Sequence, residues 1–75
     1  MIETLLDACQ FVLETEGEPQ SGLWLASQVE EMNLWRATED KVRKALKQDI
    51  KKLGESSRFV ELPNGEFGLR CWPTK

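Results

Sequence analysis

The first half of the chain contains two stretches in which hydrophobic residues recur at helical spacing. The first stretch follows Thr4, and we expect a helix from about 4 to 15 that ends at Gly17. The second follows Ser21, and we expect a helix there from about 22 to 32. The positions expected to face the core are Leu5, Ala8, Cys9, Val12, Leu13, Leu25, Val29 and Met32.

A third stretch, after Thr38, is the most clearly amphipathic segment of the chain. Asn33 offers a left-handed residue to end the preceding helix, and Thr38 is a suitable cap for the new one. Glu39 and Asp40 fall in its first turn, where the helix dipole favours negative charge, and Gly54 closes it. Its expected inner positions are Val42, Ala45, Leu46, Ile50 and Leu53.

After this helix the pattern changes to short β-prone runs on either side of Pro63-Asn64-Gly65. Asn-Gly between such runs is a strong hairpin signal, and Pro63 need not donate a hydrogen bond at a turn. Three helices followed by a C-terminal β-hairpin have the element order of a winged helix, so we predict a mostly α, α+β winged helix-turn-helix fold. The large side chains expected in the core are Trp35, Phe59, Phe67 and Leu69, with Trp72 folding back on the first helix.

The chain has 75 residues, enough for a single domain over 1–75 and too few for a sizeable active-site cavity as well. It has no histidine, so the usual proton shuttle and the commonest metal ligand are missing. Cys9 and Cys71 match no metal-binding or redox spacing, and we expect two buried, unpaired side chains. We therefore expect no enzyme, no metal, no cofactor and no small-molecule substrate.

The amino-terminal residues lack the basic segment of a signal peptide. No apolar run is long enough for a membrane span. We expect a free-standing protein of a reducing compartment, cytoplasmic or nuclear, with no membrane partner.

Charge is segregated along the chain more strongly than the net value of −3 suggests. Residues 1–35 contain seven acidic residues and no Lys or Arg, whereas residues 36–75 contain all ten basic residues and six acids. The segment 41–53, in the third helix, has six cations and one anion, Asp49. One basic face on an otherwise acidic body is compatible with a nucleic-acid partner.

Most of these cations lie opposite the apolar stripe of the third helix, and an α-helix fits the major groove of B-DNA. We predict that this face binds DNA with modest, salt-sensitive affinity, because Lys and Arg side chains reach phosphate oxygens. The alternative is a helix face that is only solvated, with cations gathered toward the helix C-terminus. The predicted DNA contacts are Lys41, Arg43, Lys44, Lys47, Gln48 and Lys51 on the helix and Arg58 at the base of the hairpin.

A second hypothesis concerns Leu23 and Trp24, which helical spacing places away from the inner stripe of the second helix. An exposed pair of this kind suggests an anchor for a protein partner, such as the transcription machinery, with the basic helix meeting an acidic surface of that partner. The alternative for the pair is packing under the hairpin or under the loop at 33–37.

Segments across nearly the whole chain resemble the HARE-type helix-turn-helix family, a group of winged helices. The stretches 49–60 and 65–70 are similar to the signature end of that family. Leu6-Asp7-Ala8 and Gly17-Glu18-Pro19 resemble its opening helix and its Gly-x-Pro turn. The segment 67–73 is similar to the end of the domain of the bacterial RNA polymerase delta subunit.

The resemblance implies a winged helix and two kinds of function. The chromatin branch of the family implies DNA binding, which falls here on Arg43, Lys44, Lys47 and Lys51. The delta-subunit branch implies docking on polymerase. This chain departs from the family where Ala37-Thr38 stands in place of the Thr-Pro that opens the third helix in many members.

Overall fold

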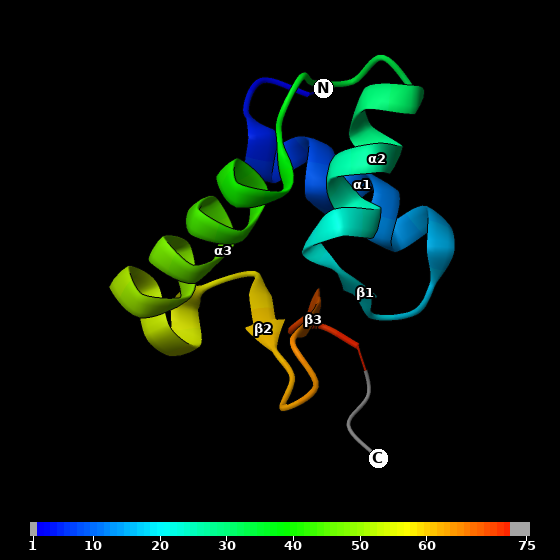
Figure 1. Cartoon of the computed structure of the whole chain (residues 1–75). Helices are drawn as coiled ribbons and strands as arrows, with labels where there is room; N and C mark the ends of the chain where they lie inside the picture. The colour runs from blue at the N-terminus through cyan, green and yellow to red at the C-terminus, as the bar shows by residue number, and fades with distance from the viewer. Residues whose placement is uncertain (1, 73–75) are drawn as a thin grey trace.

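The computed structural model describes residues 2–72 and confirms the winged helix-turn-helix fold (Figure 1). Three helices enclose the core, and a small antiparallel sheet closes it from one end. In chain order the elements are α1 (Leu5–Glu16), β1 (Gln20–Ser21), α2 (Gly22–Glu31), α3 (Glu39–Leu53), the 3-10 turn η1 (Gly54–Ser56), β2 (Phe59–Glu61) and β3 (Glu66–Leu69).

Each helix begins at the residue that the sequence predicts. The side-chain oxygens of Thr4, Ser21 and Thr38 each accept a hydrogen bond from the backbone N–H three residues on, at 3.1, 3.2 and 3.3 Å. These bonds satisfy donors that have no partner within the helix. Gly17 follows α1 with a φ of 80°, and Asn33 follows α2 with a φ of 57°. The left-handed ends predicted for the first two helices are therefore confirmed.

The sheet has one strand more than the sequence predicts. The strand order is β1-β3-β2, and the short β1 pairs with β3 so that Gln20 lies opposite Phe67. The predicted hairpin is present as β2 and β3, with Val60 opposite Gly68. Two residues are too few to show the alternating pattern of a strand, which is why β1 escapes sequence reasoning.

The hairpin turn uses Pro63-Asn64-Gly65, as predicted. The Gly65 N–H donates to the Leu62 carbonyl at 3.0 Å, and the Leu62 N–H donates to the Glu66 carbonyl at 2.8 Å. Gly65 has a φ of 88°, whereas Asn64 has no positive φ. This pattern matches a three-residue hairpin loop, in which a type I turn is followed by a left-handed glycine.

The core contains Phe59, Phe67 and Leu69 together with the inner residues of all three helices. Ala26 is buried on α2, although the predicted stripe omitted it. Three large side chains predicted inside are in fact exposed: Met32 at 41%, Trp35 at 38% and Leu53 at 46%. Met32 and Leu53 lie where α2 and α3 end, beyond the reach of the core, and Trp35 lies in the connection between the two helices.

Trp72 packs against the core, and its ring lies over Gly68 of β3. The specific prediction that it rests on the first helix stays a prediction. Cys9 is buried as expected, and burial raises the pKa of its thiol to about 12. Cys71 is exposed, so the expectation of two buried thiols was wrong for this residue. It follows the last strand, where the chain leaves the core.

Candidate nucleic-acid interface

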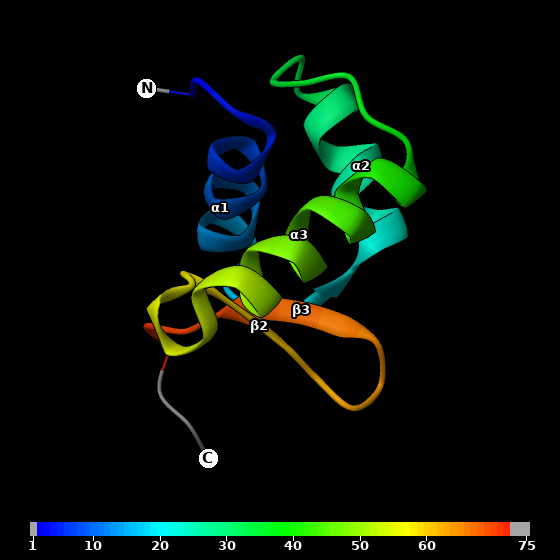
Figure 2. The same cartoon turned by 90° about the vertical axis from the view of Figure 1, so that its left-hand side faces the viewer.

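The third helix is fixed by its inner side and open on its outer side. Val42 and Leu46 are fully buried against the core, and Ile50 packs against it partly buried. In Figure 2, α3 crosses in front of the other elements, so that no segment covers the side turned to the viewer. The amphipathic pattern therefore leaves the polar side of α3 available to a partner.

Five polar side chains make up what we call the outer basic face. They are all exposed, and among residues 2–72 no ion pair involves any of the four lysines and no side-chain hydrogen bond involves the glutamine. Lys52 was placed at the flank of this face by helical spacing but was not among the predicted contacts. The outer basic face consists of Lys41, Lys44, Gln48, Lys51 and Lys52.

Two of the predicted contacts lie at the edge of this face and have carboxylate partners. Arg43 lies 3.9 Å from Glu39 one turn earlier, and Lys47 lies 3.8 Å from Glu61 on β2. Both pairs are solvent-exposed and long, so each contributes little to stability, about 0–1 kcal/mol. The stem of Arg43 also lies against Gly22, where a Cβ atom would overlap its Cγ.

Arg58 belongs to a different part of the surface. Its guanidinium donates to the Asp7 carboxylate at 2.8 Å and to the Gln10 amide oxygen at 2.7 Å, both on α1. It also lies 5.8 Å from the centre of the Phe59 ring. The hydrogen bond from Arg58 holds the pKa of Asp7 below its usual value of 3.8. Arg58 therefore joins the hairpin to α1 and is not part of the outer basic face.

The acid of the 41–53 segment is also taken up by the fold. The Ser57 hydroxyl donates to the Asp49 carboxylate, and the same hydroxyl oxygen accepts from the Phe59 N–H at 3.2 Å. Ser57 is 1% exposed, so this chain of hydrogen bonds lies at the edge of the core. Asp49 thus fixes the start of β2, and its charge is turned from the outer side of α3.

A second cation with a structural role is Arg70, to which sequence reasoning assigned none. Its guanidinium donates to the backbone carbonyls of Ser57 at 2.7 Å, Gly54 at 2.9 Å and Phe59 at 3.3 Å. It therefore joins the end of β3 to the turn that follows α3. No local sequence signal indicates this role, because the partners lie 11 to 16 residues away and are backbone atoms.

The wing formed by β2 and β3 is acidic. No Lys or Arg occurs between 59 and 69, whereas Glu61 and Glu66 lie on its two strands. At its tip the Asn64 side chain donates to the Glu66 carboxylate and accepts from the Glu66 N–H, both at 3.0 Å. Phosphates would be repelled from this hairpin, so the wing is a poor element for contacting a nucleic acid.

The predicted partner-binding pair is only half exposed. Leu23 is 59% exposed, as expected from its position at the start of α2. Trp24 is half-buried and packs against the core, so the expectation of an exposed Trp24 was wrong. The helical angle misplaced it because an indole is long enough to reach back to the core from the side of a helix.

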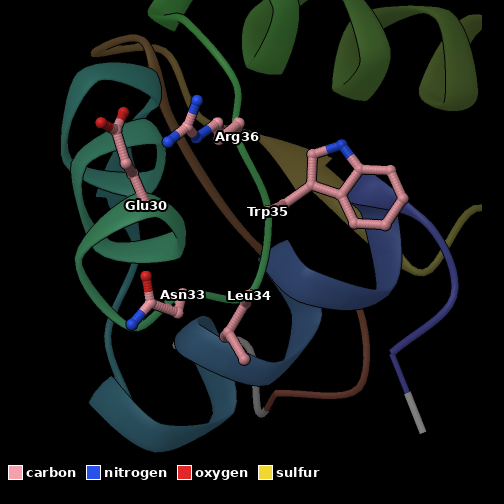
Figure 3. Close-up of a pocket in the computed structure, with 5 residues that line it drawn as sticks. All are labelled: Glu30, Asn33, Leu34, Trp35 and Arg36. Carbon is pink, nitrogen blue, oxygen red and sulfur yellow. The ribbon is translucent and has the colours of Figure 1, made fainter.

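A shallow hollow of about 410 Å³ lies at the connection between α2 and α3. Figure 3 shows Glu30 and Arg36 on one side of this connection and the Trp35 ring on the other. Glu30, Asn33 and Arg36 supply its polar groups, and no nucleophile or general base other than Glu30 lines it. Over residues 2–72 no three His, Cys, Asp or Glu side chains gather as a metal site would require. Reaction chemistry therefore has no support in this hollow.

A family comparison extends the geometric argument. A model of the HARE-HTH domain, described as the HTH domain of ASXL and restriction endonuclease proteins, matches residues 3–72. The chain belongs to the HARE-HTH family. Searches of curated proteins and of solved structures each found no significant match. The HARE-HTH assignment and the three-helix hub with its hairpin agree on a helix-turn-helix domain. None of the helices described over 2–72 combines the length and hydrophobicity needed to cross a membrane.

Proposed function

We propose that this HARE-HTH domain is a non-enzymatic module that binds duplex DNA through the outer basic face of α3. The observation that carries the proposal is the exposure of four lysines on one side of a helix, without a carboxylate partner among the described residues. Lysine side chains on such a face neutralise phosphates and release the counterions that surround DNA. Family membership supports the same reading, because a helix-turn-helix domain presents one helix to DNA.

The test compares two substitutions that change the net charge equally. Lys44→Glu alters the middle of the outer basic face, and Arg36→Glu alters an exposed cation in the connection before α3. Binding of a labelled mixed-sequence duplex at low salt should be lost or strongly weakened in the first variant. We expect it to weaken far less in the second, through net charge alone. Equal binding by wild type and Lys44→Glu would rule out the outer basic face as the DNA site.

A second function, contact with a protein partner, is favoured by Leu23. It is the most exposed large hydrophobic side chain on the helices, at the start of α2. If it anchors a partner, Leu23→Ser should abolish that contact, whereas Leu53→Ser, which removes another exposed leucine, should not. Both variants should unfold at the same urea concentration as the wild type, because neither leucine is buried. A partner that binds Leu23→Ser as well as the wild type would exclude this function.

A further inference from the structure

The two ends of α3 differ in the charges that they offer to a partner. Glu39 and Asp40 lie in the first turn, and Arg43 in the next turn lies 3.9 Å from Glu39. Lys41 is the one cation among residues 39–43 that has no ion pair in the structure. The start of α3 is therefore close to neutral and bears two carboxylates.

The C-terminal half of α3 is different. Lys51 and Lys52 lie in its last turn, both exposed and neither in an ion pair of the described residues. Asp49 is held by Ser57, and the Arg70 guanidinium adds a cation at 2.9 Å from the Gly54 carbonyl, just beyond the helix. The one acid in the turn that follows is Glu55. Positive charge is thus concentrated from Lys44 to the end of the helix.

Recognition helices of common helix-turn-helix proteins place their N-terminal residues on base edges in the major groove. Here that end carries Glu39 and Asp40, which repel phosphates on both sides of the groove. The acidic wing adds a second repulsive element. Gln48 is the one uncharged side chain of the outer basic face that can bond a base, and lysine contacts to phosphate carry no sequence information.

We infer that α3 meets duplex DNA with its C-terminal half, through backbone phosphates, and with little preference for sequence. This inference rests on the proposed function, and it adds a docking geometry and a mode of recognition. Lys44, Lys51 and Lys52 are the phosphate contacts that it names. The N-terminal turn of α3 and the wing point away from the nearest phosphates.

Two double variants with equal net charge test the geometry. Lys51→Gln/Lys52→Gln removes two cations from the C-terminal end, and Lys41→Gln/Arg43→Gln removes two from the N-terminal end. All four side chains are exposed, and circular dichroism with urea unfolding checks that both proteins keep the fold. Binding is measured by fluorescence anisotropy on an A·T-rich duplex and a G·C-rich duplex, each over a series of salt concentrations.

For the C-terminal variant we expect the slope of log K against log salt to become shallower by about 1.8, or about 0.9 per lost phosphate contact. Its affinity at about 50 mM salt should fall on the order of tenfold or more on both duplexes alike. The N-terminal variant should change the slope by less than about half that amount.

The outcomes separate the two levels of the proposal. If the wild-type protein binds neither duplex, the proposed function itself is wrong. If it binds, but the N-terminal variant loses as much as or more than the C-terminal one, the docking geometry is wrong while DNA binding stands. A preference of more than about tenfold for one duplex would overturn the sequence-independent mode, since specific sites gain about 10³ or more over other sequences.

Discussion

Replacing Arg70 with methionine removes a guanidinium that donates to three backbone carbonyls while keeping most of its aliphatic stem. Two of these carbonyls belong to Ser57 and Phe59, residues that are 1% and 0% exposed. Water reaches such carbonyls poorly, so their lost hydrogen bonds are not readily replaced. The third carbonyl, of Gly54, lies in an exposed turn where water substitutes for the guanidinium.

The size of the effect follows from the bond lengths and the exposure. A hydrogen bond from a charged donor contributes about 1.5–3 kcal/mol net. The bond to Ser57 is short at 2.7 Å, whereas the bond to Phe59 is long at 3.3 Å and Arg70 is itself exposed. We therefore expect Arg70→Met to lower the free energy of unfolding by about 2 kcal/mol. At about 4–8 °C per kcal/mol for a domain of this size, the Tm should fall by about 8–16 °C.

Thermal and urea unfolding, followed by circular dichroism, measure this loss. Lys44→Met is the matched control, because it removes an exposed cation that has no ion pair in the structure, and it should stay within about 0.5 kcal/mol of the wild type. Arg70→Lys keeps the charge but has a single nitrogen, so it should lose most of the same stability. An Arg70→Met protein as stable as Lys44→Met would refute the reasoning. A fully stable Arg70→Lys protein would show that charge near the helix end matters and the hydrogen bonds do not.

In the folded protein Cys71 should react with a thiol reagent and Cys9 only in denaturant, so rapid labelling of folded Cys71→Ser would contradict the burial of Cys9. The pKa of Asp7 is lowered by its guanidinium partner, so this ion pair adds stability above about pH 3.8 and loses it as the pH falls through the folded pKa. The urea midpoint of Asp7→Asn should fall less steeply on acidification; equal steepness would argue against the pair. Glu61→Gln should tighten DNA binding severalfold by releasing Lys47, and the gain should vanish when Lys47 is also replaced by Gln.

The features that the sequence predicts correctly are those with local causes. Thr4, Ser21 and Thr38 satisfy donors only three residues away, so their roles are visible in a short window. Gly17 and Gly65 adopt the left-handed conformations that their positions in a helix end and a turn require. Helical spacing likewise identified the uncovered side of α3, because Val42 and Leu46 fix which side faces the core.

The features that the sequence does not reveal depend on tertiary contacts. Trp35 looks like a core residue by composition, yet its loop leaves the ring 38% exposed. The partner of Lys47 lies on β2, and the partners of Arg58 lie on α1, distances in sequence that no helical wheel covers. The sequence counted Arg58 as a phosphate contact because charge alone does not show which cations the fold has already paired.

Pairing within the fold also limits how tightly this domain holds DNA. Of the six cations over 41–53, Arg43 and Lys47 face carboxylates, which leaves four lysines on the outer basic face. Four phosphate contacts correspond to a salt slope of about −3.6, whereas six would give about −5.4. Because the two edge pairs are long and exposed, a phosphate competes with each carboxylate at little cost. The measured slope therefore reports how many of these pairs DNA opens, with a value near −3.6 meaning that both remain closed.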